Sequence, residues 1–266
     1  MSEEAINFKK ENKLNYKDMK LSELLNLPAY NGVIDFKISK TSFKILNIFN
    51  DDSSAVKFFW HGSHDIVSLD LWYEICRDQG IYIDVGAHTG LYTITATKSN
   101  SLNKLVSIEP LYINLARLLT NLRLNKIKNP VNPYLFAVSD FNGISKFINN
   151  EDPSYLSKGG RIGNEGFPIQ TVKLDSLKLN RDEKIKGIKI DAEGEDYKIL
   201  IGANNLIKLH KPNIIIEVRD KNKIEIYDFF NEHNYSVADV SDPNKKIDLN
   251  KLKITNVLNI FAEPKN

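Results

Sequence analysis

Two parts of this sequence hold residues whose types and spacing could do chemistry. The first is a glycine turn within YIDVGAHTGLYTIT, at residues 82–95. There an apolar run ends at Asp84, and Gly86 and Gly90 follow before a helix-like apolar pattern begins. This pattern predicts a strand, a tight turn and the start of a helix. The free N–H groups at the start of such a helix can bind an anion.

The spacing of the glycines in this turn limits the classes of ligand that it could bind. The dinucleotide fingerprint Gly-x-Gly-x-x-Gly is not met, because His88 stands where the second glycine would be. The phosphate-binding loop that ends in Gly-Lys-Ser/Thr is absent from the chain. A ligand with an ammonium group for Asp84 and a carboxylate for the N–H groups fits better than a pyrophosphate does. The amino-acid half of S-adenosylmethionine is such a ligand.

Polar residues at the ends of the next two predicted strands support this cofactor. Glu109 ends the segment LVSIEP, where a carboxylate can accept hydrogen bonds from both ribose hydroxyls. The segment AVSD at 137–140 ends the following strand and can meet an adenine edge. One such acid often only caps the next helix, but three in register favour cofactor binding. The predicted cofactor-binding residues are Asp84, Gly86, Ala87, His88, Thr89, Gly90, Glu109, Pro110, Ser139, Asp140 and Asp191.

The second part is a set of carboxylates at the ends of two later apolar segments: Asp191, Glu193 and Glu217. A methyl donor needs an aligned acceptor, and an acceptor that carries a proton also needs a base. We therefore expect Glu193 to act as the base beside Asp191, with His88 as the alternative catalytic residue. Three carboxylates without an obvious basic partner repel one another, which predicts a shared proton or a divalent ion, Mg²⁺ on Asp191 and Glu217. The competing interpretation, acids that merely begin a helix, is sufficient for Glu195.

Other candidates have simpler structural explanations. His61 and His64 have a spacing found in metal pairs, but we expect a loop in which Ser63 or Asp65 caps a helix. Cys76 falls on the apolar face of its predicted helix and is expected in the core. We assign none of them a chemical role.

Alternating apolar strands and helices must position the chemical residues. Strands are expected at 81–85, 105–109, 133–138, 187–191 and 213–218. Helices are expected at 65–77, 90–98, 112–124, 195–208 and 222–233. This alternation predicts an α/β fold with a parallel sheet covered on both faces, in which ligands bind at the carboxyl ends of the strands.

The segments around this core are less regular. A hairpin or two edge strands are expected at 33–39 and 42–49, and an antiparallel edge at 235–240 and 256–262. The glycine-rich stretch 154–167 is expected to form a mobile loop, either a lid that closes over the acceptor or a surface loop that stays open.

Composition limits the partners and the compartment. The 36 basic and 34 acidic residues give a net charge of +2, which offers no surface for nucleic acid or an anionic membrane. The single cysteine excludes an internal disulfide, and the charged N-terminus is not a signal peptide, so we expect a cytoplasmic protein. No apolar run is long enough to span a bilayer.

The order of these motifs resembles the FkbM-type family of S-adenosylmethionine-dependent methyltransferases. The matching stretches are IDVGAHTG, VSIEP, NLRLN, AVSD, TVKLDSL, IKIDAEGED and KPNIIIEV. The resemblance implies a class I methyltransferase (Rossmann-like) fold, with a mostly parallel seven-stranded sheet, helices on both faces and an antiparallel last strand. It also implies O-methylation, often of a sugar or polyketide hydroxyl, and related macrocin-type enzymes use a divalent metal. His88 departs from the small polar residue that the family more often has.

The chain is therefore expected to comprise an N-terminal α+β extension at 1–65, which could contact substrate or a second subunit, and an S-adenosylmethionine-binding domain at 66–266. The favoured activity is O-methylation of a hydroxyl on a sugar or glycosylated metabolite. Nucleic-acid methylation is disfavoured, because the fourth strand is followed by Ala-Glu-Gly and not by an Asn/Asp-Pro-Pro-aromatic motif. Methylation of another small molecule and a catalytically silent cofactor-binding module are the remaining alternatives. The oligomeric state is not predicted.

Overall fold

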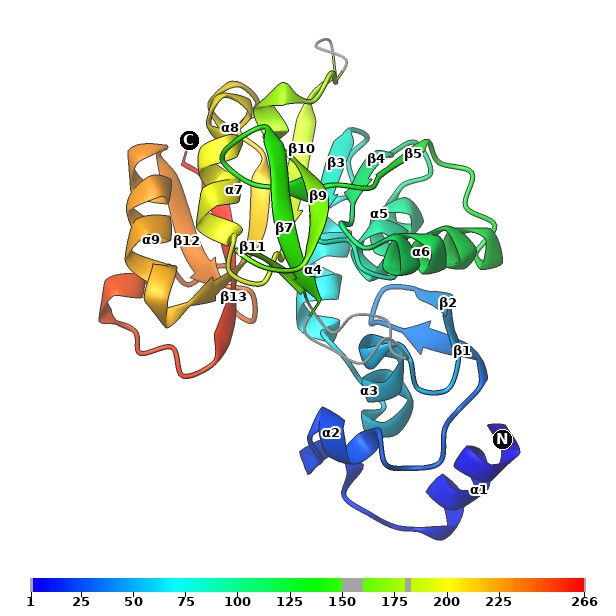
Figure 1. Cartoon of the computed structure of the whole chain (residues 1–266). Helices are drawn as coiled ribbons and strands as arrows, with labels where there is room; N and C mark the ends of the chain where they lie inside the picture. Colours follow the sequence, from blue (N-terminus) through cyan, green and yellow to red (C-terminus); the bar gives the residue numbers. More distant parts are fainter. Residues whose placement is uncertain (1, 150–159, 180–182, 266) are drawn as a thin grey trace.

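A seven-stranded sheet forms the centre of the computed structural model, which describes residues 2–149, 160–179 and 183–265 (Figure 1). The strand order is β12-β13-β11-β10-β3-β4-β5. All strands run in one direction except β13, which is antiparallel to both of its neighbours. This confirms the predicted mostly parallel sheet. The strands are β3 (Ile81–Val85), β4 (Lys104–Ile108), β5 (Val131–Tyr134), β10 (Ile185–Ile190), β11 (Asn213–Arg219), β12 (Tyr235–Asp239) and β13 (Val257–Pro264).

Helices cover both faces of this sheet. Along β3, Ile83 packs against the helices of one face and Tyr82 against those of the other, because successive side chains of a strand point to opposite sides. One face holds α7 (Asp196–Gly202), α8 (Asn204–His210) and α9 (Lys223–Glu232). The other holds α4 (Ile66–Ile75), α5 (Leu91–Ser99) and α6 (Tyr112–Leu124). Within the described ranges, no helix has the length and apolar character needed to cross a membrane.

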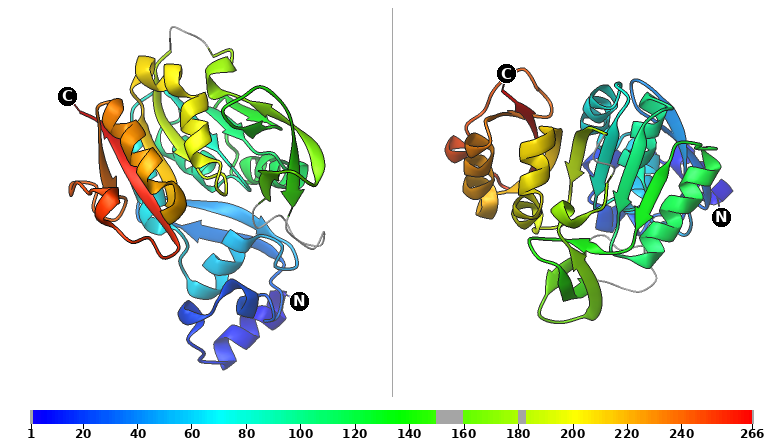
Figure 2. Two further views of the ribbon diagram at one scale, coloured as in Figure 1. Left: turned by 60° about the vertical axis from the view of Figure 1, so that its left-hand side comes forward. Right: turned by 90° about the horizontal axis from the view of Figure 1, so that it is seen from above.

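The N-terminal extension lies at one end of the sheet and is blue in Figure 2. Its expected hairpin is confirmed by the antiparallel pairing of β1 and β2. The amide oxygens of Asn121 on α6 and of Asn125, which follows this helix, accept hydrogen bonds from the backbone of β2, at Leu46 and Lys44. The extension therefore shares a core with the sheet. Its elements are α1 (Ser2–Glu11), α2 (Leu21–Leu24), β1 (Gly32–Lys37), β2 (Ser42–Asn47) and α3 (Ser53–His61).

The prediction of a single strand at 133–138 is wrong. The chain leaves the main sheet after Tyr134, and the next strand belongs to a second sheet of order β6-β9-β7-β8. The apolar run is continuous in the sequence, but Leu135 is exposed at the bend between the two sheets. The second sheet consists of β6 (Ala137–Val138), β7 (Gly143–Asn149), β8 (Gly160–Gly163) and β9 (Phe167–Val172). Short 3₁₀ helices are η1 (Tyr16–Asp18), η2 (Leu174–Ser176), η3 (Asp220–Asn222) and η4 (Leu249–Lys251).

The helix expected at 195–208 is divided into α7 and α8 at Ala203. Gly202 lies so close to the carbonyl oxygen of Ser139 that a Cβ at this position would be 2.1 Å from that oxygen. The N–H of Ala203 bonds to the carbonyl of Leu200, a tightened final turn. The break between α7 and α8 thus coincides with a contact to the segment after β6. Local helix propensity does not include such a contact, so the sequence did not predict the break.

The loop expected at 154–167 is only partly described. Residues 154–159 lie outside the described residues, so the proposed closure over the acceptor is not addressed. Residues 160–163 form β8, which pairs with β7, so the loop prediction is wrong there. A Cβ on Gly160 would lie 2.0 Å from the ring of Phe147, which shows that this glycine serves packing against the neighbouring strand.

Candidate active site

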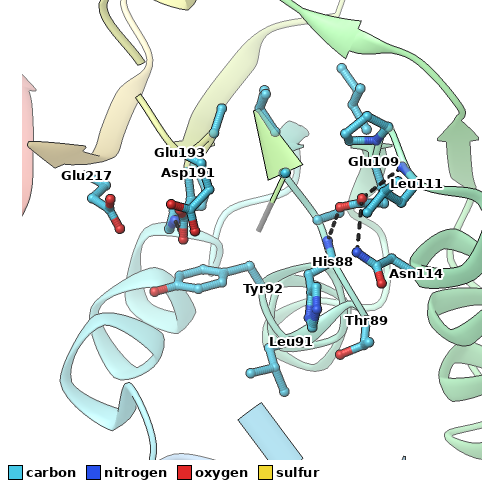
Figure 3. A pocket seen from close by; sticks show the side chains of 18 of the residues that line it. His88, Thr89, Leu91, Tyr92, Glu109, Leu111, Asn114, Asp191, Glu193 and Glu217 are labelled. Atoms are coloured by element: carbon cyan, nitrogen blue, oxygen red, sulfur yellow. Dashed lines mark hydrogen bonds and ion pairs between the residues drawn. The ribbon is translucent and has the colours of Figure 1, made fainter. Parts of the chain in front are cut away.

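A cavity of about 520 Å³ lies where β3, β4, β10 and β11 end. It is lined by the turns after β3 and β4, by acidic residues at the ends of β10 and β11, and by β13 (Figure 3). The N-terminal extension contributes Ser53, Ser54, Lys57, His64 and Asp65. This is the edge of the sheet at which open α/β folds bind ligands.

The glycine turn has the conformation that its sequence predicts. Gly86 and Gly90 have φ angles of +77° and +99°, in a region that favours glycine. The N–H groups of Gly86 and Ala87 both donate to the carbonyl oxygen of Ile108, at 2.9 Å. His88 is also left-handed, with a φ of +48°. The turn is therefore fixed against the end of β4, with its backbone at the cavity wall.

Glu109 is held rigidly in the cavity wall. Its Oε2 accepts a hydrogen bond from the backbone N–H of His88, at 2.8 Å (Figure 3). Its Oε1 accepts from the N–H of Leu111 and from Nδ2 of Asn114, at 3.0 and 3.2 Å. Burial raises the pKa of Glu109, against the opposing effect of His88 and these hydrogen bonds. The sequence did not indicate Asn114, because it lies in the first turn of α6 and not at a strand end.

The other predicted cofactor residues divide into two groups. Those that line the cavity with Glu109 are Gly86, Ala87, His88, Thr89, Pro110 and Asp191. Asp84 instead lies buried beneath the turn, where its Oδ2 accepts a hydrogen bond from Thr93 Oγ1 at 2.7 Å. Burial raises the pKa of Asp84 to about 6. Gly90 provides the backbone turn that begins α5.

The segment expected at the adenine edge presents apolar residues to the cavity. Ser139 and Asp140 do not line it, and the Ser139 hydroxyl donates to Glu195 Oε2 at 2.8 Å. Ser139 therefore supports the start of α7. The residues of this segment that do line the cavity are Phe136, Ala137 and Val138.

Asp191 has a basic partner that the sequence analysis missed. The Lys189 ammonium lies 3.2 Å from Asp191 Oδ2 and 4.6 Å from the centroid of the Tyr92 ring. Its side chain is only 2% exposed. Burial lowers the pKa of Lys189, but the carboxylates of Asp191, Asp65 and Asp84 outweigh this effect, so the pKa is raised. The ammonium group therefore stays charged inside the wall.

Glu193 and Glu217 share a second basic partner. Arg219 Nη2 donates to Glu193 Oε2 at 2.7 Å and to Glu217 Oε1 at 2.6 Å. The Glu217 side chain is 12% exposed, and that of Glu193 is 41% exposed. Burial and the charge of Asp191 raise the pKa of Glu217 to about 7. The same causes raise the pKa of Glu193. The expectation of carboxylates without basic partners is therefore wrong.

The residues do not fit the expected Mg²⁺ site. Mg²⁺ requires several oxygen ligands in octahedral geometry. Here Lys189 and Arg219 are paired with Asp191 and Glu217, the two residues assigned to the metal. In the part of the chain that the structure describes, no group of three His, Cys, Asp or Glu side chains is arranged to hold a metal. Ion pairing explains the acidic cluster without a metal ion.

The two histidines at 61 and 64 also have separate environments. His61 Nε2 lies 3.2 Å from the carbonyl oxygen of Met19, within the N-terminal extension. His64 lines the cavity, where burial and the nearby Lys57 lower its pKa, so the imidazole is neutral at pH 7. Asp65 precedes α4 and accepts a hydrogen bond from the Tyr92 hydroxyl.

Three residues of the cavity wall each have a side-chain oxygen without a partner in the described part of the protein. Thr89 Oγ1, Asn114 Oδ1 and Asn259 Oδ1 are buried and have no hydrogen-bond partner among the described residues. All three residues line the cavity. Buried polar atoms in proteins almost always have partners. Glu109 and these atoms thus offer hydrogen-bond acceptors at the cavity wall.

The sheet, its order and the ligand site at the carboxyl ends of its strands define a class I methyltransferase fold. The model of the methyltransferase FkbM domain matches residues 84–237, more than half of the chain. The chain thus belongs to the FkbM family of S-adenosylmethionine-dependent methyltransferases. No curated protein sequence matches it.

Solved structures show the same fold. The FkbM methyltransferase of Methylobacillus flagellatus KT is 15% identical, with a TM-score of 0.50, and the match covers 80% of this chain and 54% of that one. This chain thus spans about half of the length of that protein. The S-adenosylmethionine-dependent methyltransferase of Agrobacterium tumefaciens is 10% identical, with a TM-score of 0.52, over 90% of this chain and 72% of that one. At these identities the likeness concerns the fold alone.

Proposed function

We propose that this protein transfers a methyl group from S-adenosylmethionine to a hydroxyl of a sugar or glycosylated metabolite. The observation that carries the proposal is the pair of carboxylates, Glu193 and Glu217, on one guanidinium beside the cofactor turn. A hydroxyl acceptor must lose a proton during transfer, and a carboxylate with a raised pKa can receive it.

The cofactor would lie across the glycine turn. The N–H groups of Gly86, Ala87, His88 and Gly90 already donate within the protein. The N–H of Thr89 and the start of α5 would therefore hold the amino-acid half of the cofactor, and Glu109 would accept a hydrogen bond from the ribose. Phe136 and Val138, which line the cavity, would offer an apolar surface to the adenine. When bound, S-adenosylmethionine supplies an electrophilic methyl group.

Glu217 is better placed than Glu193 to act as the base. Arg219 occupies Oε1 of Glu217, and Oε2 receives no protein hydrogen bond in the described structure. Glu217 is also the more buried of the two, which reduces competition from water. Glu217 would receive the proton that the acceptor hydroxyl loses when it is methylated. Arg219 keeps the carboxylate oriented throughout.

The test is a screen of nucleotide sugars and short glycans with S-adenosylmethionine, read as a mass gain of one methyl group. Glu217→Gln should lower turnover by roughly 10²–10⁴, the usual contribution of a positioned base, with unchanged affinity for S-adenosylhomocysteine. Glu193→Gln is the matched comparison and should lose less. If Glu193→Gln loses more, the base is Glu193, as the sequence first suggested. If both retain full activity, the acids are structural.

Other acceptors are outcomes of the same screen. A nearly balanced charge of +2 supports a small molecule or glycan over nucleic acid. Methylation of an RNA oligonucleotide in place of any hydroxylated small molecule would contradict the proposal. Cofactor binding without turnover on any acceptor would indicate a silent module. We also propose a cytoplasmic location. We further propose that the N-terminal extension contacts the acceptor, because residues of α3 line the cavity.

A further inference from the structure

One wall of the cavity includes residues outside the part of the chain that the family model matches. The family match ends at residue 237, and β13 begins at Val257. Yet β13 pairs directly with β11, and Asn259 lies opposite Glu217 in the register of these two strands. Both residues line the cavity.

The two side chains share one face of the sheet. Residues directly opposite each other on antiparallel strands have Cβ atoms about 4.5–5.5 Å apart, close enough for one small ligand to reach both. Two residues further into the sheet, Ile215 and Phe261 form the next opposed pair and pack in the core beneath α4. Glu217 and Asn259 are thus the polar end of an apolar cross-strand ladder.

The amide of Asn259 has one end occupied and one end without a partner. Its Nδ2 donates to Ser68 Oγ on α4 at 3.4 Å. Its Oδ1 is buried without a partner among residues 2–149, 160–179 and 183–265. An amide oxygen can only accept a hydrogen bond, so the wall lacks a donor at this point. Glu217 likewise presents an oxygen, because Arg219 occupies only Oε1.

We propose that Glu217 and Asn259 bind two adjacent hydroxyl groups of the acceptor, a vicinal diol. Two hydrogen-bond acceptors side by side match two donors on neighbouring carbons, as in a sugar ring. Glu217 binds the hydroxyl that is methylated, and Asn259 Oδ1 binds its neighbour. This inference rests on the proposed function and assigns to Asn259 the selection of the acceptor.

The experiment uses saturation-transfer NMR on the full chain with S-adenosylhomocysteine present. The probes are methyl α-D-mannopyranoside and its 2-deoxy and 3-deoxy analogues. Wild-type protein should bind the parent glycoside about three- to tenfold more tightly than the deoxy analogue that lacks the hydroxyl bound by Asn259, the scale of one neutral hydrogen bond. Asn259→Leu should abolish this preference. Asn256→Leu, an exposed position before the same strand, should retain it.

Calorimetry with S-adenosylhomocysteine shows whether the variant keeps the cofactor site. The inference is overturned if wild-type protein binds none of the glycosides or does not distinguish them, or if Asn259→Leu keeps the preference. Its failure is separable from that of the proposed function. If the protein prefers the diol but transfers no methyl group, the diol subsite is supported and the proposed O-methylation is contradicted. If methyl transfer occurs and Asn259→Leu does not change the preference for the diol, only the diol subsite is contradicted.

Discussion

The carbonyl oxygen of Asp191 occupies the space in which a side chain on Gly86 would begin. A Cβ on Gly86 would lie 1.8 Å from this oxygen. The N–H of Asp191 also donates to the carbonyl of Val85, so the turns after β3 and β10 are in direct backbone contact. The part of the wall that fits the cofactor and the part that carries the acids therefore cannot move independently.

Gly86→Ala should destabilise the protein and abolish cofactor binding. The matched control is Gly62→Ala, because Gly62 has nearly the same φ, +76° against +77°, but nothing lies within 4 Å of its Cβ position. We expect Gly62→Ala to lower the free energy of unfolding by about 1–2 kcal/mol, the penalty of a left-handed residue with a Cβ. Gly86→Ala should lower it by at least twice as much, as measured by urea denaturation. Equal losses would mean that the contact with Asp191 relaxes freely.

Glu217 should make stability depend on pH. Its pKa of about 7 in the folded protein exceeds the ordinary value of 4.5, so the folded state holds this proton more tightly than the unfolded state does. The resulting stabilisation is complete below about pH 4.5 and is lost as pH rises through about 7. Glu217→Gln should remove this dependence and stabilise the protein at pH 8 by on the order of 1–3 kcal/mol relative to wild type.

The measurement is the melting temperature from pH 5 to pH 8, for wild type, Glu217→Gln and Glu225→Gln. Glu225 is an exposed residue of α9 and should leave the slope unchanged. A wild-type slope that Glu217→Gln does not flatten would show that this carboxyl titrates normally. The same titration predicts that methyl transfer increases with pH through about 7, because the base must be deprotonated.

Glu109 should be required for cofactor affinity, and Asp140 should not. Glu109→Ala removes an acceptor for the ribose and leaves three protein donors unpaired, so binding of S-adenosylhomocysteine should weaken by at least about 1.5–3 kcal/mol. Asp140→Asn should bind within about twofold of wild type, because Asp140 does not line the cavity. Isothermal calorimetry compares them. A large loss in Asp140→Asn would restore the adenine contact that the sequence suggested.

Lys189→Met should cost far more stability than Lys186→Met on the same strand. Removal of the buried ammonium leaves Asp84 and Asp191 without their cation. Because the Asp191 side chain is 40% exposed, we expect a loss of about 2–3 kcal/mol, below the range for fully buried pairs. Lys186 pairs with a largely exposed Asp78 and should change stability by less than about 1 kcal/mol. Urea denaturation at pH 7 measures both. Similar small changes would mean that water reaches the Lys189 site.

The sheet and the cofactor turn could be predicted because they depend on local patterns. Apolar strands ending in acids, and glycines at left-handed positions such as Gly86, are recognisable in the chain itself. The ion pairs could not be predicted this way. Strands buried on both faces give no alternation of polar residues, so Lys189 in IKGIKI is indistinguishable from a surface lysine. Its role emerges only when Asp84, from a neighbouring strand, is placed beside it.

Residues that belong to the site through distant pairing were also missed. Asn259 lies in an unremarkable strand, and only its register with Glu217 brings it to the cavity. The second sheet escaped prediction for a similar reason, because β6 has two residues and depends on β9 for its pairing. Arg219 was overlooked as the last residue of an apolar strand, although it stands two positions after Glu217.

The position of β13 has a consequence for how this protein forms on the ribosome. Because β13 follows β12 in the chain but lies between β11 and β12, β12 has no partner when it first emerges. Until β13 is synthesised, the edge of β11 is unpaired and can pair with strands of other chains. Arrival of β13 closes this edge and docks β12 in one step. The same step brings Asn259 to the cavity. A nascent chain that has formed the glycine turn but not β13 would therefore lack the residue that we propose selects the acceptor.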